Sequence, residues 1–252
     1  MLEQDERRDE LLEKIEDLIS RKRYAELRDL LLPLEAQDIA GLFMELDDKV
    51  PMVFRLLPKE QAAEVFVELD SEEQEMLIQS FSNTELKEVL DELYLDDAVD
   101  IVEEMPANVV KRILRHADPE VRKSINEILK YPDDCAGSIM TTEYVDLKAT
   151  MTVEDALKRI RRTGPDKETI NICYVIDEGR HLLGYLSIRT ILLSEEDDVI
   201  GDIMDTHVIS ANTLDDQEDV AQILNKYDFL ALPIVDTENR LVGIVTVDDA
   251  MD

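Results

Sequence analysis

The sequence predicts an α plus α/β chain in which an N-terminal all-α superhelical (solenoid) domain precedes a tandem pair of βαββα units. Three observations predict this fold class. Apolar residues recur at helical spacing through the first half, a motif repeats there every 24 or 25 residues, and a longer strand-and-helix pattern occurs twice in the second half. The 252 residues exceed one typical domain of roughly 100 to 200 residues, so two or three compact units are expected.

Residues 1–131 form the predicted helical domain. Equivalent helix starts fall at residues 33, 58, 82 and 106. A second break divides most units into two short helices. These breaks lie at residues 46–48, 69–71 and 95–97. Stacked pairs would bury an apolar face that no single pair can bury alone, and the excess carboxylates would lie on the outer face.

A proline-containing turn at residues 131–134 ends the helical pattern, and strands then alternate with helices. The predicted strands are residues 144–147, 172–177 and 182–187, and the predicted helices are 152–163 and the segment from 188. The segments 175–177 and 184–187 recur 59 residues later. Two copies of one βαββα unit are therefore predicted, at residues 137–200 and 201–252.

Charge and composition exclude several classes of protein. The 60 acidic residues against 27 basic ones give a formal net charge of −33, which repels nucleic acids and anionic lipid surfaces, so no nucleic-acid partner is expected. Cys135 and Cys173 lie outside any C-x-x-C pattern and indicate reduced thiols. The sequence shows neither a secretory signal nor an apolar run of about 18 residues, so the chain as given is expected to be soluble and cytoplasmic.

No enzyme motif is recognisable in the sequence. His116, His181 and His207 are scattered and form neither H-E-x-x-H nor a His/Cys metal pattern. The seven glycines form neither G-x-G-x-x-G nor a P-loop, and no G-x-S-x-G elbow occurs. The sequence therefore predicts no catalytic residue.

The repeated unit resembles the CBS domain, a module that usually occurs in pairs. The resemblance rests on the endings at residues 177–187 and 236–246, which follow an Asp-x(n)-Gly-x-x-Ser/Thr pattern, and on the strand entry at 227–235. The helical repeats ahead of it narrow the resemblance to the MgtE family of magnesium transporters. The segments that carry this second resemblance are residues 93–100, 131–145 and 245–249.

The MgtE resemblance implies a homodimer whose cytoplasmic part precedes a connecting helix and a transmembrane pore. The sequence stops within the opening turns of a helix at residues 248–252, which predicts that it ends before the pore. We therefore expect a regulatory part that lies at the cytoplasmic face of the cell membrane and gates its own pore domain.

Magnesium is a small, hard cation that keeps much of its water and is held by one or two carboxylates. In so acidic a chain, any one pair of carboxylates also fits a solvated helix face. The resemblance assigns seven of them to magnesium because they match acidic positions of the family's sites. These residues are Asp96, Asp100, Asp216, Glu218, Asp228, Asp249 and Asp252.

The resemblance also implies a mechanism of feedback inhibition. Without the cation, facing carboxylates would repel one another and hold the domains and the two subunits apart. Bound magnesium would remove this repulsion and compact the dimer. Because the ions bind the compact state better, they would shift an existing equilibrium toward it and close the pore.

Two other functions are compatible with the sequence. CBS pairs commonly bind adenosine nucleotides, and Thr246 with Asp249 fits the pattern of a phosphate-binding hydroxyl and a ribose-binding Asp, which makes ATP a second candidate ligand. Ser187 is the equivalent of Thr246 in the first repeat, where Thr190 replaces the Asp. Both hydroxyls also fit ordinary helix caps. The helical repeats alone also fit a docking scaffold for a basic partner.

Overall fold

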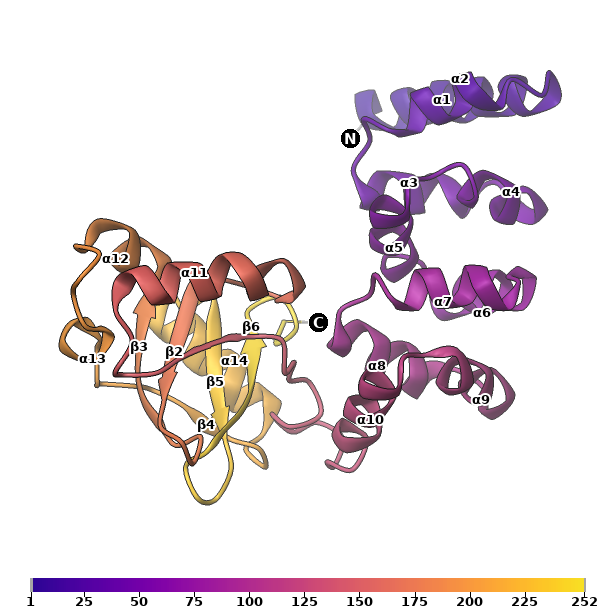
Figure 1. The fold of residues 1–252 in the computed structure, drawn as a ribbon. Helices are drawn as coiled ribbons and strands as arrows, with labels where there is room; N and C mark the ends of the chain where they lie inside the picture. The colour runs from indigo at the N-terminus through magenta and orange to yellow at the C-terminus, as the bar shows by residue number, and fades with distance from the viewer. Residues whose placement is uncertain (1, 252) are drawn as a thin grey trace. The chain divides into compact units, whose positions relative to one another are not determined.

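The computed structural model describes residues 2–251, with side chains from residue 8 onward. The chain divides into two compact units. The first comprises residues up to 93 and 100–122, and the second comprises residues 94–99 and those from 123 onward. The predicted fold class is confirmed, since a helical solenoid precedes two small mixed sheets (Figure 1). Within the described range, no helix is both long and apolar enough to cross a membrane.

Short helices packed in successive layers build the first unit (Figure 1). They are α1 (Leu2–Ser20), α2 (Tyr24–Leu31), α3 (Ala36–Phe43), η1 (Asp47–Lys49), α4 (Val50–Phe54), α5 (Lys59–Val67), α6 (Ser71–Ser80), α7 (Asn83–Leu90), α8 (Leu95–Glu104), α9 (Ala107–His116) and α10 (Pro119–Ile128). The first turn of α8 and the end of α10 belong to the second unit. Helices α3, α5, α7 and α9 contact one another in sequence order, which gives the repeat its stacking direction.

Three of the four predicted helix starts are the residues that cap a helix. Pro58 and Pro106 immediately precede α5 and α9, where the missing N–H of proline costs nothing. Ser82 and Glu85 form a reciprocal capping box at α7. The exception is α3, which begins three residues after Pro33 because residues 31–34 form a turn.

Aromatic rings and an arginine join neighbouring repeats of the helical unit. The ring of Phe54 lies 5.4 Å from that of Phe81 and 6.3 Å from that of Phe66, measured between centroids. Arg112 of α9 donates hydrogen bonds to the carbonyl oxygens of Ile78 and Phe81 at the end of α6. These carbonyls have no partner within their own helix, so the guanidinium replaces the water that they would otherwise need.

The second unit contains two three-stranded sheets, each with one parallel and one antiparallel pair of strands. Its elements are β1 (Val145–Leu147), α11 (Val153–Thr163), η2 (Gly164–Asp166), β2 (Ile172–Ile176), β3 (Leu182–Ser187), α12 (Ile188–Leu193), α13 (Ile200–Ile203), β4 (Ala211–Asn212), α14 (Gln217–Tyr227), β5 (Ala231–Val235) and β6 (Leu241–Thr246). The predicted strands and the predicted helix over residues 152–163 agree with these bounds to within one residue.

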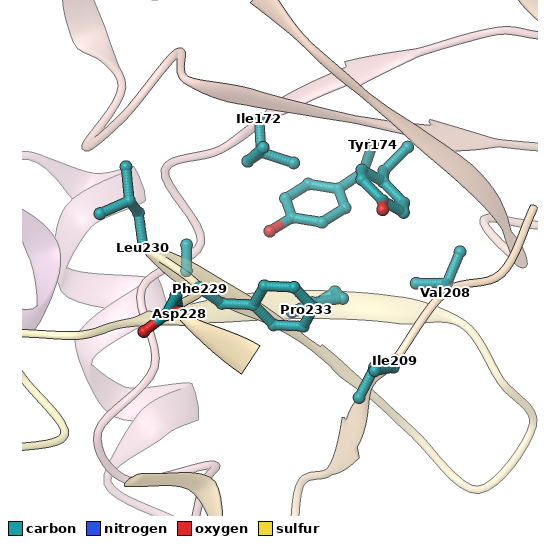
Figure 2. Close-up of a pocket in the computed structure, with 10 residues that line it drawn as sticks. Ile172, Tyr174, Val208, Ile209, Asp228, Phe229, Leu230 and Pro233 are labelled. Atoms are coloured by element: carbon teal, nitrogen blue, oxygen red, sulfur yellow. The ribbon is translucent and has the colours of Figure 1, made fainter. Parts of the chain in front are cut away.

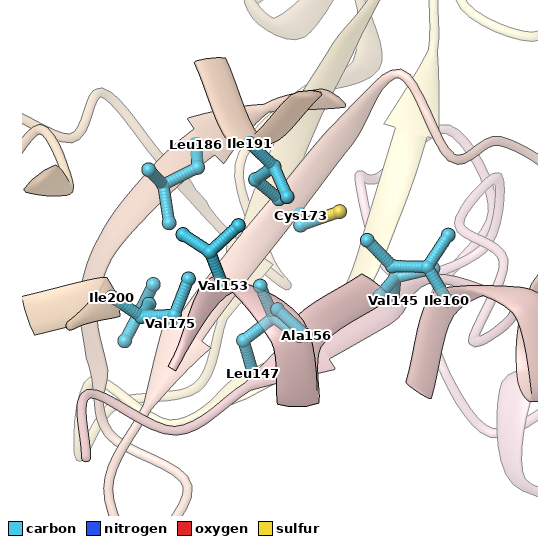
Figure 3. Packing of buried hydrophobic residues seen from close by; sticks show 10 residues of the cluster. All are labelled: Val145, Leu147, Val153, Ala156, Ile160, Cys173, Val175, Leu186, Ile191 and Ile200. Carbon is cyan, nitrogen blue, oxygen red and sulfur yellow. The ribbon is translucent and has the colours of Figure 1, made fainter. Parts of the chain in front are cut away.

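Strand alternation places each side of β2 in a different core. Cys173 and Val175 pack with α11 and α12 in the core shown in Figure 3. Tyr174 and Ile176 point the other way and pack with residues of β5 and β6. The second face of β2 therefore joins the two repeats.

Candidate functional site

Three carboxylates from distant parts of the sequence meet in the second unit. Asp96 is the second residue of α8, Glu168 lies in the segment before β2, and Asp249 follows β6. The side chain of Asp96 is only 8% exposed, while Glu168 and Asp249 are half-buried. One oxygen of Glu168, Oε2, is buried without a hydrogen-bond partner among the described residues. The cluster is therefore a set of hard oxygen donors that is partly shielded from water.

Burial and mutual repulsion raise the pKa of all three groups. Burial, together with the charges of Asp249 and Glu168, raises the pKa of Asp96 to about 9. Burial and the nearby Asp249 raise the pKa of Glu168 to about 7. Burial also raises the pKa of Asp249, although hydrogen bonds from Thr246 and Asp96 oppose the change. At neutral pH, the Asp96 carboxyl group keeps its proton and donates a hydrogen bond to Asp249.

No positive charge compensates this cluster within the described chain. None of the three carboxylates forms an ion pair with a described Lys, Arg or His side chain. No group of three or more Asp, Glu, His or Cys side chains among the described residues has the geometry of a ready metal cage. Magnesium does not require such a cage, because it is held by one or two carboxylates and retained water. The oxygen donors present here fit that ion.

The other predicted magnesium ligands within the described residues are not members of this cluster. Asp100 is one turn beyond Asp96 on α8, is exposed, and belongs to the first unit. Asp216 caps the N-terminus of α14 by accepting a hydrogen bond from the N–H of Glu218 at 2.9 Å. Asp228 ends the same helix in the left-handed conformation, with φ of 54°.

The eleven residues of α14 separate the two ends of that helix by about 15 Å, so Asp228 does not share an ion with Asp216. Asp216, Glu218 and Asp228 are all exposed. Asp252 lies outside the described residues. Among the six predicted ligands that the structure describes, Asp96 and Asp249 are the two that come from distant segments and meet in one cluster.

An apolar cleft of about 220 Å³ lies between the two repeats of the second unit (Figure 2). Its walls come from β2 and β3 of the first repeat and from the segments 208–209 and 228–233 of the second. The lining residues are Ile172, Tyr174, Tyr185, Val208, Ile209, Asp228, Phe229, Leu230, Ala231 and Pro233. A cleft with aromatic and aliphatic walls and few polar groups suits a flat organic ring.

The three predicted nucleotide contacts do not line this cleft. Ser187 caps α12 by accepting a hydrogen bond from the N–H of Thr190 at 3.0 Å, so the helix-cap interpretation of Ser187 is confirmed. Thr246 lines a second cleft of about 360 Å³, whose walls include Glu168 and Asp248. The hydroxyl of Thr246 donates to Asp249, and the surrounding carboxylates repel a phosphate.

Neither Glu168 nor the apolar cleft was predicted from the sequence. Glu168 belongs to an irregular segment with no repeat counterpart that the spacing could reveal. Phe229 was identified in the sequence only as part of the strand entry at residues 227–235. Both features depend on contacts between segments that are far apart in the sequence.

Comparison with known proteins agrees with this architecture. The family model for the MgtE intracellular N domain matches residues 34–134, and the CBS domain model matches residues 136–196 and 200–252. The magnesium transporter MgtE of Thermus thermophilus is 39% identical over 231 residues, which are 90% of this chain and 51% of the relative. That of Bacillus subtilis is 34% identical over 245 residues, covering 97% and 54%. The chain thus spans about half the length of these curated relatives.

Two solved structures match nearly the whole chain. One is the cytosolic domain of the Mg²⁺ channel MgtE in complex with ATP, with a TM-score of 0.90, 38% identity, and coverage of 96% of this chain and 99% of that one. The other is the soluble part of a magnesium transporter, with a TM-score of 0.87, 33% identity, and coverage of 97% of both chains.

Proposed function

The chain belongs to the MgtE family, and we propose that it is the magnesium-sensing regulatory part of a magnesium transporter, acting at the cytoplasmic face of the membrane. Its relatives are transporters, and we propose no catalytic step for it. Sensing would occur through carboxylates, and the readout would be the gating of a pore domain in the whole protein.

The observation that carries this proposal is the cluster of Asp96, Glu168 and Asp249. These three carboxylates are partly shielded from water and have no basic partner. Their ionised forms are therefore unfavourable, and their pKa values are raised. A divalent cation would let all three ionise and would turn repulsion into attraction. A bound divalent cation would therefore stabilise this cluster.

Helix α8 supplies a path from this cluster to the helical unit. Asp96 lies in the first turn of α8, which belongs to the second unit, and the helix belongs to the first unit from Asp100 onward. Ion binding that orders this turn would act on both units through one continuous helix. Magnesium would then select one arrangement of the chain from those that exist without it.

We expect the functional form to be a homodimer. The exposed carboxylates Asp100, Asp216, Glu218 and Asp228 would bind an ion firmly only if a second surface supplied further oxygen atoms. Leu192 and Leu193 on α12 are 61% and 76% exposed, which is unusual for adjacent leucines and suits a face buried by a second copy. Sedimentation of Leu192→Glu, with Leu214→Glu as a control at another exposed leucine, would test this assignment.

Small-angle scattering across a magnesium titration tests the sensor proposal. The titration would run from zero to about 20 mM at constant ionic strength, which holds nonspecific screening fixed. We expect a saturable fall in the radius of gyration that Asp96→Asn and Asp249→Asn weaken and that Asp38→Asn, at an exposed position of α3, leaves unchanged. No magnesium-dependent change in the wild-type chain would contradict the proposal.

The apolar cleft supports a second function, the binding of an adenine nucleotide. Phe229 and Ile172 supply a surface for a flat base, and a similar structure is a complex with ATP. Nucleotide binding would occur in addition to magnesium sensing, at a different site of the second unit. Calorimetry with ATP would test it, with Phe229→Ala as the variant that removes the aromatic wall. ATP binding to both proteins with equal affinity would place the nucleotide elsewhere.

A further inference from the structure

Glu143, in the segment before β1, is a half-buried carboxylate of the second unit that contacts the start of α8. Its Oε2 accepts a hydrogen bond from the backbone N–H of Leu95, the first residue of α8, at 3.3 Å. The first N–H groups of a helix have no acceptor within the helix, so another part of the chain or water must supply one. Leu95 lies 48 positions earlier in the sequence, and the side chain of Glu143 therefore joins two distant segments.

The backbone of Glu143 is fixed by hydrogen bonds to the other segments of the carboxylate cluster. Its carbonyl oxygen accepts from the N–H of Glu168 at 2.9 Å, and its own N–H donates to the hydroxyl of Thr141 at 3.3 Å. Thr141 is completely buried and exchanges two backbone hydrogen bonds of 2.9 Å with Ile244 of β6, the strand that precedes Asp249. The backbone around Glu143 thus joins the segments that carry Glu168 and Asp249.

The side chain of Glu143 adds the third member of the cluster, because Leu95 is the residue before Asp96. Holding the N–H of Leu95 fixes the first turn of α8 against the second unit, and this places Asp96 within hydrogen-bond reach of Asp249. Fixing a backbone segment costs conformational entropy. If the turn is already fixed in the free chain, that entropy is not lost when an ion binds, and affinity is higher.

Glu143 also has the chemistry of a direct magnesium ligand, so the two roles must be separated. Burial raises the pKa of Glu143, while the hydrogen bond from Leu95 and the charge of Lys167 lower it. Its charge in turn contributes to the raised pKa of Glu168. A carboxylate and an amide oxygen accept a hydrogen bond from one N–H in the same way. They differ as ligands, because only the carboxylate brings the negative charge that magnesium prefers.

We propose that Glu143 is a positioning residue of the magnesium response, which holds the first turn of α8 so that Asp96 meets Asp249 and Glu168 before the ion binds. This inference rests on the proposed sensor function and adds to it a residue that acts through a hydrogen bond and not as a ligand. Because coupling is reciprocal, magnesium bound at the cluster should also strengthen the attachment of this turn.

Two substitutions of Glu143 separate the hydrogen bond from the charge. Glu143→Met removes the acceptor at similar side-chain length, whereas Glu143→Gln keeps an acceptor oxygen and removes the charge. We expect magnesium affinity, measured by calorimetry, to fall about 3- to 10-fold in Glu143→Met and to stay within about twofold of the wild-type value in Glu143→Gln. Glu178→Met, at an exposed position, controls for the loss of one negative charge and should also stay within about twofold.

Hydrogen exchange of the backbone amides of residues 95–99 provides a measurement that needs no metal. Without magnesium, these amides should exchange about 3- to 10-fold faster in Glu143→Met than in the wild-type chain, while those of α11 should exchange at the wild-type rate. Glu143→Gln should exchange like the wild-type chain, and magnesium should slow exchange at residues 95–99 in both.

Three outcomes would overturn the inference. Equal losses of magnesium affinity in Glu143→Met and Glu143→Gln would make Glu143 a ligand. Wild-type affinity and exchange in Glu143→Met would show that the hydrogen bond does not hold the turn. Faster exchange throughout the second unit of Glu143→Met would show a general structural role. Absence of magnesium binding to the wild-type chain would instead refute the sensor function, and this inference with it.

Discussion

The hydroxyl of Thr246 donates a hydrogen bond to Oδ2 of Asp249 at 2.5 Å. This bond favours the ionised carboxylate, whereas burial and the neighbouring Asp248 favour the protonated form. Thr246→Val removes the hydroxyl at nearly constant volume. We expect magnesium affinity, measured by calorimetry near neutral pH, to fall about 3- to 30-fold, because Asp249 must ionise without this donor.

Thr246→Ser is the control for that experiment, because it keeps the hydroxyl. It should bind magnesium as the wild-type chain does. Thr246 does not line the apolar cleft, so ATP affinity should be the same in all three proteins. Equal magnesium affinity of the Val and Ser variants would mean that the hydroxyl does not tune Asp249.

Magnesium affinity should depend on pH through Glu168 and Asp96. Their pKa values lie at about 7 and about 9, and a protonated carboxyl group must release its proton before it binds the ion. We expect the apparent affinity to rise between about pH 6 and pH 9, with proton release that calorimetry in buffers of different ionisation enthalpy would measure. Asp96→Asn should remove the upper part of this rise. A flat profile in the wild-type chain would place the ion elsewhere.

The same two groups predict how stability without magnesium depends on pH. Both pKa values are higher in the folded chain than in the unfolded chain, so both groups favour folding at low pH. That contribution is lost as the pH rises through about 7 for Glu168 and about 9 for Asp96. The melting temperature should therefore fall from about pH 6 to pH 9.5, and saturating magnesium should reduce the fall. Fluorescence-monitored melting with and without the ion measures both effects.

The sequence predicted the fold because its signals are local. Helical spacing, the helix start at Ser82 and the apolar strand segment at residues 172–177 each depend on a few adjacent residues. Because the helical repeat and the βαββα unit each recur along the chain, the elements assigned in one copy also predict the elements of the other copies. Only α3 begins three residues from its predicted start, where Pro33 lies in a turn before the cap.

The candidate site was less predictable because it depends on contacts between distant segments. Asp96 and Asp249 were predicted through family position, but nothing local to Glu168 indicates that it faces them. The spacing of Asp216 and Asp228 already places them at opposite ends of one helix, so their separation follows from the sequence once α14 is assigned. The unpaired hydroxyl of Tyr174 appears only when the two repeats pack together.

Gly184 and Gly243 occupy equivalent places in β3 and β6 and should tolerate no larger residue. A Cβ atom at Gly184 would lie 2.6 Å from the carbonyl oxygen of Asp205, and one at Gly243 would lie 2.8 Å from that of Thr141. We expect alanine at either position to destabilise the second unit by about 1–3 kcal/mol. Urea denaturation measures this change.

At Gly41, in contrast, we expect alanine to stabilise the protein. It lies inside α3, and a Cβ atom there would meet nothing within 4 Å. Gly41→Ala should therefore stabilise the helical unit by about 0.5–1 kcal/mol, because alanine loses less backbone entropy in a helix. Destabilisation by Gly41→Ala, or neutrality of Gly184→Ala, would contradict the packing described here.

Arg112 should contribute more to the helical unit than any of its exposed basic neighbours. Its guanidinium donates to the carbonyl oxygens of Ile78 and Phe81, and α9 thereby holds the end of α6. Arg112→Met keeps much of the apolar stem but leaves both carbonyls without this donor, so we expect a loss of about 1.5–3 kcal/mol in urea denaturation. Lys111→Met, at the adjacent exposed position, should change stability by less than about 0.5 kcal/mol. Equal effects of the two substitutions would show that water replaces the guanidinium at no cost, and that the repeats are held together by their apolar contacts alone.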